Sequence, residues 1–109
     1  MQLVSDVYAT TSGFPKSEAF GLVAQMRRCA ISIPSNIAEG TARKSRSELV
    51  YFLTVAQGSL SELDTQVEIA RRLGFIKDGS QLQQRLDRVF SLLLGLSRSL
   101  KPASSPPPR

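Results

Sequence analysis

The chain has 109 residues, of which 41% are hydrophobic, and an excess of lysine and arginine gives it a formal net charge of +5. It contains no histidine and one cysteine, Cys29, which excludes an internal disulfide bond, a histidine general base and the usual zinc-ligand sets. The positive charge is compatible with acidic partners such as nucleic acid, or it serves solubility alone, and composition does not choose between them.

The N-terminus does not have the pattern of a signal peptide. Residues 1–13, MQLVSDVYATTSG, contain no basic region ahead of an apolar run. No apolar run in the chain approaches the roughly 20 residues that are needed to span a bilayer. We therefore expect a cytoplasmic protein that does not enter a membrane.

Helical periodicity begins close to the N-terminus. A first helix is predicted over residues 2–11, where apolar side chains recur at helical spacing: Leu3, Val4, Val7 and Tyr8. The segment SGFP at residues 12–15 then breaks the chain. The second predicted helix begins at Ser17 and loosens or ends at Gly40. Its apolar face contains residues at steps of three and four: Phe20, Val23, Met26, Ala30, Ile33 and Ile37.

Pro34 interrupts this second helix. Proline has no backbone N–H and its ring crowds the carbonyl of Ala30, so we predict a kink near Pro34. The kink can simply curve the helix around the core. Alternatively, Asn36, Glu39 and Arg43 form a polar cluster on one face, at a subunit interface or binding surface. The candidates for a structural motif or subunit interface are Pro34, Asn36, Glu39 and Gly40.

The third predicted helix has Ser45 or Ser47 as its N-cap and continues for about 27 residues to a left-handed turn at Gly74. Its seam is close to heptad spacing and contains Leu49, Phe52, Ala56, Leu60, Leu63, Val67 and Ala70. Gly58 and Ser59, in the middle of this helix, would allow a neighbouring helix to approach closely.

The fourth predicted helix follows residues 78–80, and its seam contains Leu82, Leu86, Val89, Leu93, Leu96 and Leu100. Short connections between long amphipathic helices predict antiparallel neighbours. The predicted fold class is therefore all-α, an antiparallel up-and-down four-helix bundle. We assign residues 1–101 to this bundle domain and residues 102–109, PASSPPPR, to a disordered Pro/Ser-rich tail.

Basic residues are concentrated on either side of an acidic third helix. Residues 16–46 and 74–109 contain more lysine and arginine than aspartate and glutamate, whereas residues 47–73 have the opposite balance. The candidates for contact with nucleic-acid phosphates are Arg27, Arg28, Arg43, Lys44, Arg46, Arg85, Arg88 and Arg98. The alternative is a solvated surface, or salt bridges between subunits. The sequence contains no base-reading module, so we expect binding that tolerates base sequence and weakens with salt.

The residue types needed for catalysis do not form a recognisable constellation. A di-metal carboxylate site in a helix bundle needs Glu-x-x-His motifs, and the chain has no histidine. Glu62 and Glu68 are six positions apart, and Ser35, Ser59 and Cys29 have no neighbouring base. No glycine-rich phosphate loop is found. We therefore expect a protein that is not an enzyme and needs no metal or cofactor.

Two segments together resemble one known family. QMRRCAISIPSNIAEGTARKS, residues 25–45, is similar to the signature of four-helix-bundle proteins encoded in intervening sequences of bacterial 23S ribosomal RNA genes. YFLTVAQGSLSELDTQVEIARRLGFI, residues 51–76, is similar to the third helix of that family. The likeness extends over residues 3–100, and relatives usually have extra residues before the position of Gln2, which implies a shortened first helix. The matching motif residues are Arg27, Arg28, Pro34, Asn36, Glu39, Gly40 and Arg43.

The resemblance implies an assembly and a class of partners. Similar proteins form a four-helix protomer that assembles into a barrel-like homopentamer. The family also includes accessory proteins of diversity-generating retroelements, which bind a reverse transcriptase and nucleic acid through a basic surface. Apolar surface beyond one bundle seam, on the second and fourth helices, is compatible with self-association. We therefore expect a non-catalytic homopentamer that binds RNA or DNA as an accessory factor. The alternative is a protein-docking scaffold with no nucleic-acid role.

Overall fold

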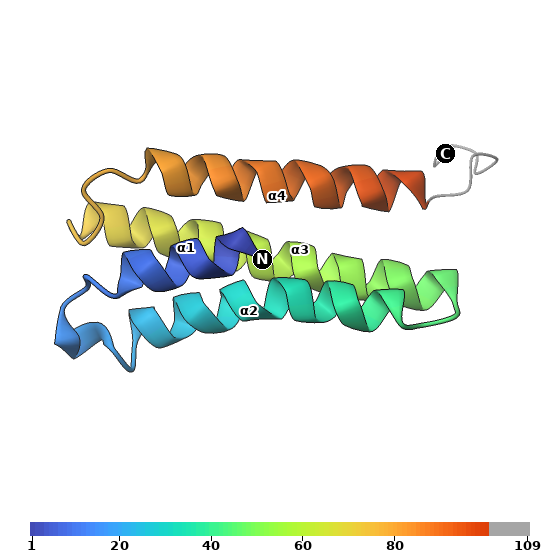
Figure 1. Cartoon of the computed structure of the whole chain (residues 1–109), viewed down its shortest axis with the longest axis horizontal. Coiled ribbons are helices and arrows are strands. Elements are labelled where there is room, and N and C mark those ends of the chain that lie inside the picture. Colours follow the sequence, from blue (N-terminus) through green and yellow to red (C-terminus); the bar gives the residue numbers. More distant parts are fainter. Residues whose placement is uncertain (101–109) are drawn as a thin grey trace, which may run out of the picture.

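The computed structural model describes residues 1–100, which form a bundle of helices joined by short connections (Figure 1). Four helices alternate in direction along the chain: α1 (Gln2–Thr11), α2 (Leu22–Thr41), α3 (Arg46–Arg72) and α4 (Ser80–Ser99). The described part of the chain contains no strand, so the predicted all-α class and antiparallel four-helix bundle are confirmed. None of these helices is both long enough and apolar enough to cross a membrane. The predicted tail, residues 102–109, lies outside the described residues.

Helix α3 begins and ends with the capping residues that the sequence predicts. The Ser45 side chain accepts a hydrogen bond from the backbone N–H of Glu48 at 3.3 Å, as expected of an N-cap. At the other end Gly74 adopts a φ of +80°, and the N–H of Phe75 donates to the carbonyl of Ala70 at 2.9 Å. This hydrogen bond satisfies a carbonyl that the end of a helix leaves unpaired. The predicted left-handed turn at Gly74 is therefore confirmed.

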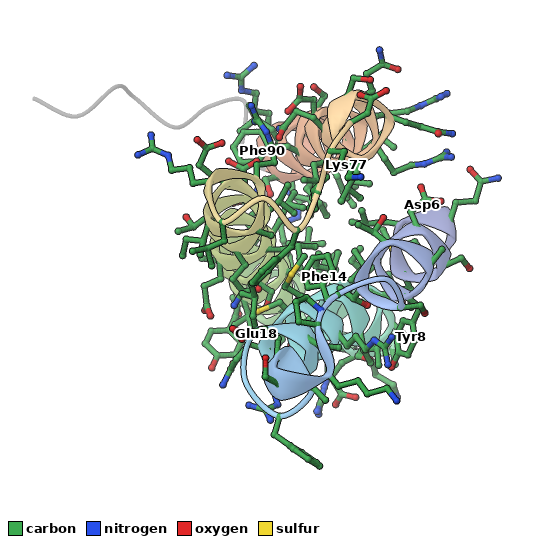
Figure 2. The ribbon with its side chains drawn as sticks, turned by 90° about the vertical axis from the view of Figure 1, so that its left-hand side faces the viewer. Asp6, Tyr8, Phe14, Glu18, Lys77 and Phe90 are labelled. Atoms are coloured by element: carbon green, nitrogen blue, oxygen red, sulfur yellow. The ribbon has the colours of Figure 1, made fainter. Side chains whose placement is uncertain are left out.

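The core lies along the axis of the bundle and uses most of the predicted seam of α3. Its fully buried members are Ala56, Leu60, Leu63, Val67 and Ala70. Leu49 and Phe52 are only half-buried, and Leu53, which the heptad pattern leaves out, is fully buried. Figure 2 shows Phe14 pointing between the helices at one end of the bundle, where its ring centroid lies 5.5 Å from that of Phe75. These two rings close the core at the end where α3 turns into α4.

The start of α2 differs from the prediction. The chain does not enter the helix at Ser17 but forms a short 3₁₀ turn, η1 (Lys16–Glu18), and α2 begins at Leu22. Gly21 has φ −100° and ψ −105°, which are not helical values, so a continuous helix cannot pass through it. Phe20 consequently lies outside the core and is 98% exposed. Its prediction as part of the apolar face was wrong.

α2 continues through Pro34, which is half-buried inside the helix and does not end it. The predicted kink at this proline stays a prediction. Gly40 also lies within the helix, whose last residue is Thr41. The helix therefore ends one residue beyond the predicted glycine.

The seam of α4 is buried only as far as Leu93. Its buried residues are Leu82, Leu86, Val89 and Leu93. Leu96 is exposed, so its prediction as a core position was wrong, whereas Leu100 is half-buried and packs against the core. The physical reason is the length of α1, which has ten residues and covers only the half of the bundle where α4 begins (Figure 1). Without α1 beside it, Leu92 on the second half of α4 is 66% exposed.

Candidate functional site

The signature segment of α2 contacts α3 through hydrogen-bonded polar side chains. The hydroxyl oxygens of Ser32 on α2 and Ser59 on α3 lie 2.8 Å apart. Asn36 Nδ2 donates to the Ser32 hydroxyl at 2.9 Å and to the Ser32 carbonyl at 2.8 Å. All three side chains are partly buried, so losing one of these bonds leaves a poorly solvated polar group. Both hydrogen bonds of the Asn36 amide stay within α2, and Ser32 connects them to Ser59 on α3.

Gly40 lies where α2 and α3 pack closely. A Cβ atom at this position would lie 3.0 Å from Phe52 Cβ and 3.1 Å from Leu49 Cδ1, both on α3. Phe52 Cβ is attached directly to the backbone, so it cannot move aside without moving α3. A larger residue at position 40 would therefore have to push α2 and α3 apart by a few tenths of an ångström.

Cys29 lies on the same side of α2 and is buried. Its Sγ lies 3.7 Å from Glu62 Oε2 on α3. Burial raises the pKa of the Cys29 thiol above its ordinary value of 9.0, and the negative charge of Glu62 raises it further, while a hydrogen bond with Gln66 opposes both. A thiol that keeps its proton is a weak nucleophile. The environment of Cys29 therefore favours a packing role.

Glu39 and Arg43 form the ion pair that their spacing predicts, on the exposed surface near the end of α2. Arg43 also lies 3.8 Å from Glu48 on α3, and its guanidinium carbon is 5.4 Å from the ring centroid of Phe52. Two carboxylates thus offset the charge of Arg43. Its contacts connect α2 with the start of α3.

Two of the predicted phosphate ligands make contacts with α1. Arg27 on α2 donates from Nε to the Thr11 hydroxyl at 2.9 Å, and its guanidinium carbon lies 4.4 Å from the ring centroid of Tyr8. Arg85 on α4 forms an ion pair with Asp6, with 2.8 Å between Nε and Oδ2. Both arginines are partly buried, and their guanidinium groups make contacts within the chain.

Arg46, the first residue of α3, contacts the end of α4. α4 runs antiparallel to α3, so its last residues lie beside the first residues of α3 (Figure 1). Arg46 Nη1 donates to the carbonyl of Leu100 at 3.2 Å, which joins the two segments directly. We call Lys44, Arg46 and Arg98 the basic end. Each of the three is exposed, and none has a carboxylate within 4 Å among residues 1–100.

The last two candidates lie on different helices, Arg28 on α2 and Arg88 on α4, and both are exposed. Arg88 lies beside Arg85 at a shallow hollow along α4 that also includes Gln81 and Gln84. The eight basic candidates therefore do not form one surface on a single chain. Three of them, the residues of the basic end, lie at one end of the bundle, where Arg46 contacts the end of α4.

A groove with a volume of about 520 Å³, which no sequence pattern predicted, lies between α3 and α4. We call it the α3–α4 groove. Its lining includes Leu60, Asp64, Thr65, Leu86, Asp87 and Phe90. Gln83 Nε2 donates to Asp64 Oδ1 at 3.0 Å and to Asp87 Oδ1 at 2.9 Å. The spacing of Gln83 and Asp87 was visible in the sequence, but the pairing with Asp64 was not. Within the described chain, no three acidic or cysteine side chains are grouped so that they could hold a metal ion.

The four-helix architecture agrees with the family that the signature segment of the sequence resembles. A model of the family described as 23S rRNA-intervening sequence protein matches residues 1–95. The chain belongs to this family. The matched residues include α1, α2, α3 and most of α4, so the 23S rRNA-intervening sequence protein family accounts for nearly the whole bundle. A comparison with curated proteins found no match.

Of the signature residues, Gly40 lies directly against α3, and Asn36 holds Ser32, whose hydroxyl contacts Ser59 on α3. Glu39 and Arg43 lie on the surface at the end of the same contact. The suggested relation to accessory proteins of diversity-generating retroelements stays a prediction.

Proposed function

We propose that this 23S rRNA-intervening sequence protein is a non-catalytic homopentamer of the cytoplasm that binds the phosphate backbone of RNA or DNA as an accessory factor. The observation that carries the proposal is the basic end, where Lys44, Arg46 and Arg98 are exposed and have no carboxylate within 4 Å among the described residues. Guanidinium and ammonium groups without an acidic partner are available to phosphate oxygens. Binding of this kind positions a protein on nucleic acid without reading bases.

Self-association supports this function by repeating the basic end. A ring brings several copies of one patch to the same nucleic-acid strand, which strengthens binding without new contacts. Exposed apolar side chains on several elements offer surface for such an assembly: Phe20, Tyr51, Leu73 and Leu92. A reverse transcriptase is the protein partner that we propose from the resemblance.

The experiment combines light scattering after gel filtration with fluorescence anisotropy on a short RNA and a short DNA duplex. Replacing the basic end with Lys44→Gln, Arg46→Gln and Arg98→Gln should weaken binding at least about tenfold at about 50 mM salt. The slope of log affinity against log salt should fall by about 0.9 for each phosphate contact that is lost.

A matched control removes three positive charges at the opposite end of the bundle, with Lys16→Gln, Arg72→Gln and Lys77→Gln. All three side chains are exposed. The control should lose much less affinity than the basic-end variant. Equal losses would indicate an effect of net charge and contradict a localised site. A monomeric mass would contradict the assembly.

The second candidate function is a protein-docking scaffold with no nucleic-acid role. The partly exposed aromatic ring of Phe90 in the α3–α4 groove favours this second function, because a partner protein could bury it. An oligomer that ignores RNA and DNA at every salt concentration would exclude the first function and leave this one.

A further inference from the structure

The α3–α4 groove combines apolar and acidic walls. Leu60 on α3 and Leu86 on α4 line it and are buried, whereas Phe90, which also lines it, is 45% exposed. Figure 2 shows Phe90 projecting from α4 on the side that faces α3. An aromatic ring that is half-open to water beside a groove becomes buried when a partner side chain fills that groove. The groove therefore offers apolar contact that the chain itself does not use.

Two carboxylates lie on opposite helices at this groove. The amide nitrogen of Gln83 is hydrogen-bonded to one oxygen of Asp64 and to one oxygen of Asp87, so a single neutral group holds two like charges close together. Neither carboxylate has a lysine or arginine within 4 Å in residues 1–100. Neighbouring carboxylates repel each other, and a cation placed between them removes this repulsion.

The other acidic side chains of α3 already have partners. Glu48 lies 3.8 Å from Arg43, and Glu62 lies 3.7 Å from the thiol of Cys29. Glu68 pairs with Arg71 and Arg72 at 3.0 Å each, and the hydrogen bond from Arg72 holds the pKa of the Glu68 carboxyl below its usual value. Asp64 is thus the acidic residue of α3 that is left facing a second carboxylate.

We infer that the α3–α4 groove is a docking site for a basic amphipathic helix of a partner protein. An apolar side chain on that helix packs against Phe90 above the buried Leu60 and Leu86, and an arginine takes the place of the Gln83 amide between Asp64 and Asp87. The planar guanidinium has five N–H donors, enough for two carboxylates, and it also stacks on aromatic rings.

Two features define the partner. The groove lies between two antiparallel helices, which is the setting in which a third amphipathic helix is bound by its apolar face. Nucleic acid does not fit here, because its phosphates would meet Asp64 and Asp87. This inference uses residues outside the basic end and goes beyond the proposed nucleic-acid binding, so either can fail without the other.

The test is a selection from a displayed library of helical peptides of about 16 residues, or four helical turns, in which arginine, lysine, glutamate, glutamine, leucine and phenylalanine are varied at surface positions. The full-length protein is the target, and the Asp64→Asn/Asp87→Asn variant is the counter-target. Selected peptides should contain arginine or lysine beside apolar residues spaced by three and four.

The affinity of these peptides is then measured by fluorescence anisotropy. The double variant should bind at least about tenfold more weakly, and Phe90→Ala should also lose several-fold in affinity. The control variant Glu39→Gln/Glu48→Gln removes two carboxylates from the α2–α3 surface and should change affinity less than about twofold. Circular dichroism and elution volume confirm that each variant is folded.

Three results would overturn the inference. The selection could enrich nothing, or only peptides without basic residues. The selected peptides could bind the double variant as tightly as the natural protein. Finally, light scattering could give a different mass for the double variant and the natural protein, which would assign the groove to contacts between copies of this chain.

Discussion

Asp6 on α1 and Arg85 on α4 form an ion pair between residues that are 79 positions apart in the sequence, with 2.8 Å between Oδ2 and Nε. Arg27 on α2 contacts Thr11, the last residue of α1. Two arginines from different helices therefore hold the shortest helix of the bundle. Both belong to the set that the sequence suggested as phosphate ligands.

The first prediction concerns this ion pair. Arg85→Met keeps most of the apolar stem but leaves the carboxylate of Asp6 without its partner. We expect the free energy of unfolding to fall by about 1 kcal/mol, since both side chains are only about 30% exposed. Urea denaturation measures the change, and Arg88→Met is the exposed control on the same helix. Equal effects of the two substitutions would contradict a specific role of Arg85.

The second prediction compares two glycines inside helices. Gly40→Ala should lower the free energy of unfolding by about 1–3 kcal/mol, because the new Cβ would lie 3.0 Å from Phe52 Cβ. Gly58→Ala should raise it by up to about 1 kcal/mol, because a Cβ there has no atom within 4 Å and alanine favours the helix. Thermal or urea unfolding measures both changes. If the two substitutions change the free energy of unfolding in the same direction, close packing of α2 and α3 at Gly40 is ruled out. Loss of assembly in Gly58→Ala would place that residue between subunits.

The third prediction tests the polar network in which Asn36 is hydrogen-bonded to Ser32 on α2, and Ser32 to Ser59 on α3. Asn36→Asp has nearly the same shape but replaces two N–H donors with an acceptor that faces the carbonyl and hydroxyl of Ser32. We expect a loss of about 2 kcal/mol at neutral pH. Ser35→Asp, on the exposed face of the same helix, is the control for introducing a charge. A loss no larger than that of the control would show that these hydrogen bonds do not stabilise the fold.

The fourth prediction follows from the raised pKa of the Cys29 thiol. An acid whose pKa is higher in the folded chain keeps its proton there to higher pH, so the free energy of unfolding falls as the pH rises past 9.0. Cys29→Ala should lack this part of the pH dependence between about pH 8 and 10. Alkylation by iodoacetamide should be slow in the native protein and should become faster in Glu62→Gln, which removes a nearby negative charge. An unchanged rate would exclude an electrostatic effect of Glu62.

The sequence predicted those features of the fold that depend on neighbouring residues. The N-cap at Ser45, the left-handed Gly74 and the apolar seam of α3 all follow from local rules. Phe20 was misplaced because apolar spacing continues across Gly21, whereas the backbone does not stay helical there. Leu96 was misplaced because its burial depends on the reach of α1, which lies far away in the sequence.

The candidate site was predictable only in part for the same reason. Lys44 and Arg46 are close in the sequence, but Arg98 joins them only because α4 runs antiparallel to α3. Ser32 and Ser59 are 27 positions apart, and their hydrogen bond needs the packed helices. A single sequence does not indicate which residues of different helices lie side by side. The proximity of Asp64 and Asp87 was therefore not predicted.

The docking of α1 on α2 and α4 has a consequence for how the molecule opens. An isolated helix of fewer than about 12 residues is barely stable in water, so the ten residues of α1 are helical because they are docked on α2 and α4. Amide hydrogens of α1 therefore exchange with deuterium whenever this helix detaches, at a lower free energy than those of the α3 core. Detachment uncovers Leu3 and Val7 and breaks the Asp6–Arg85 pair. Because salt weakens that pair, we expect the amide hydrogens of α1 to exchange faster as the ionic strength rises.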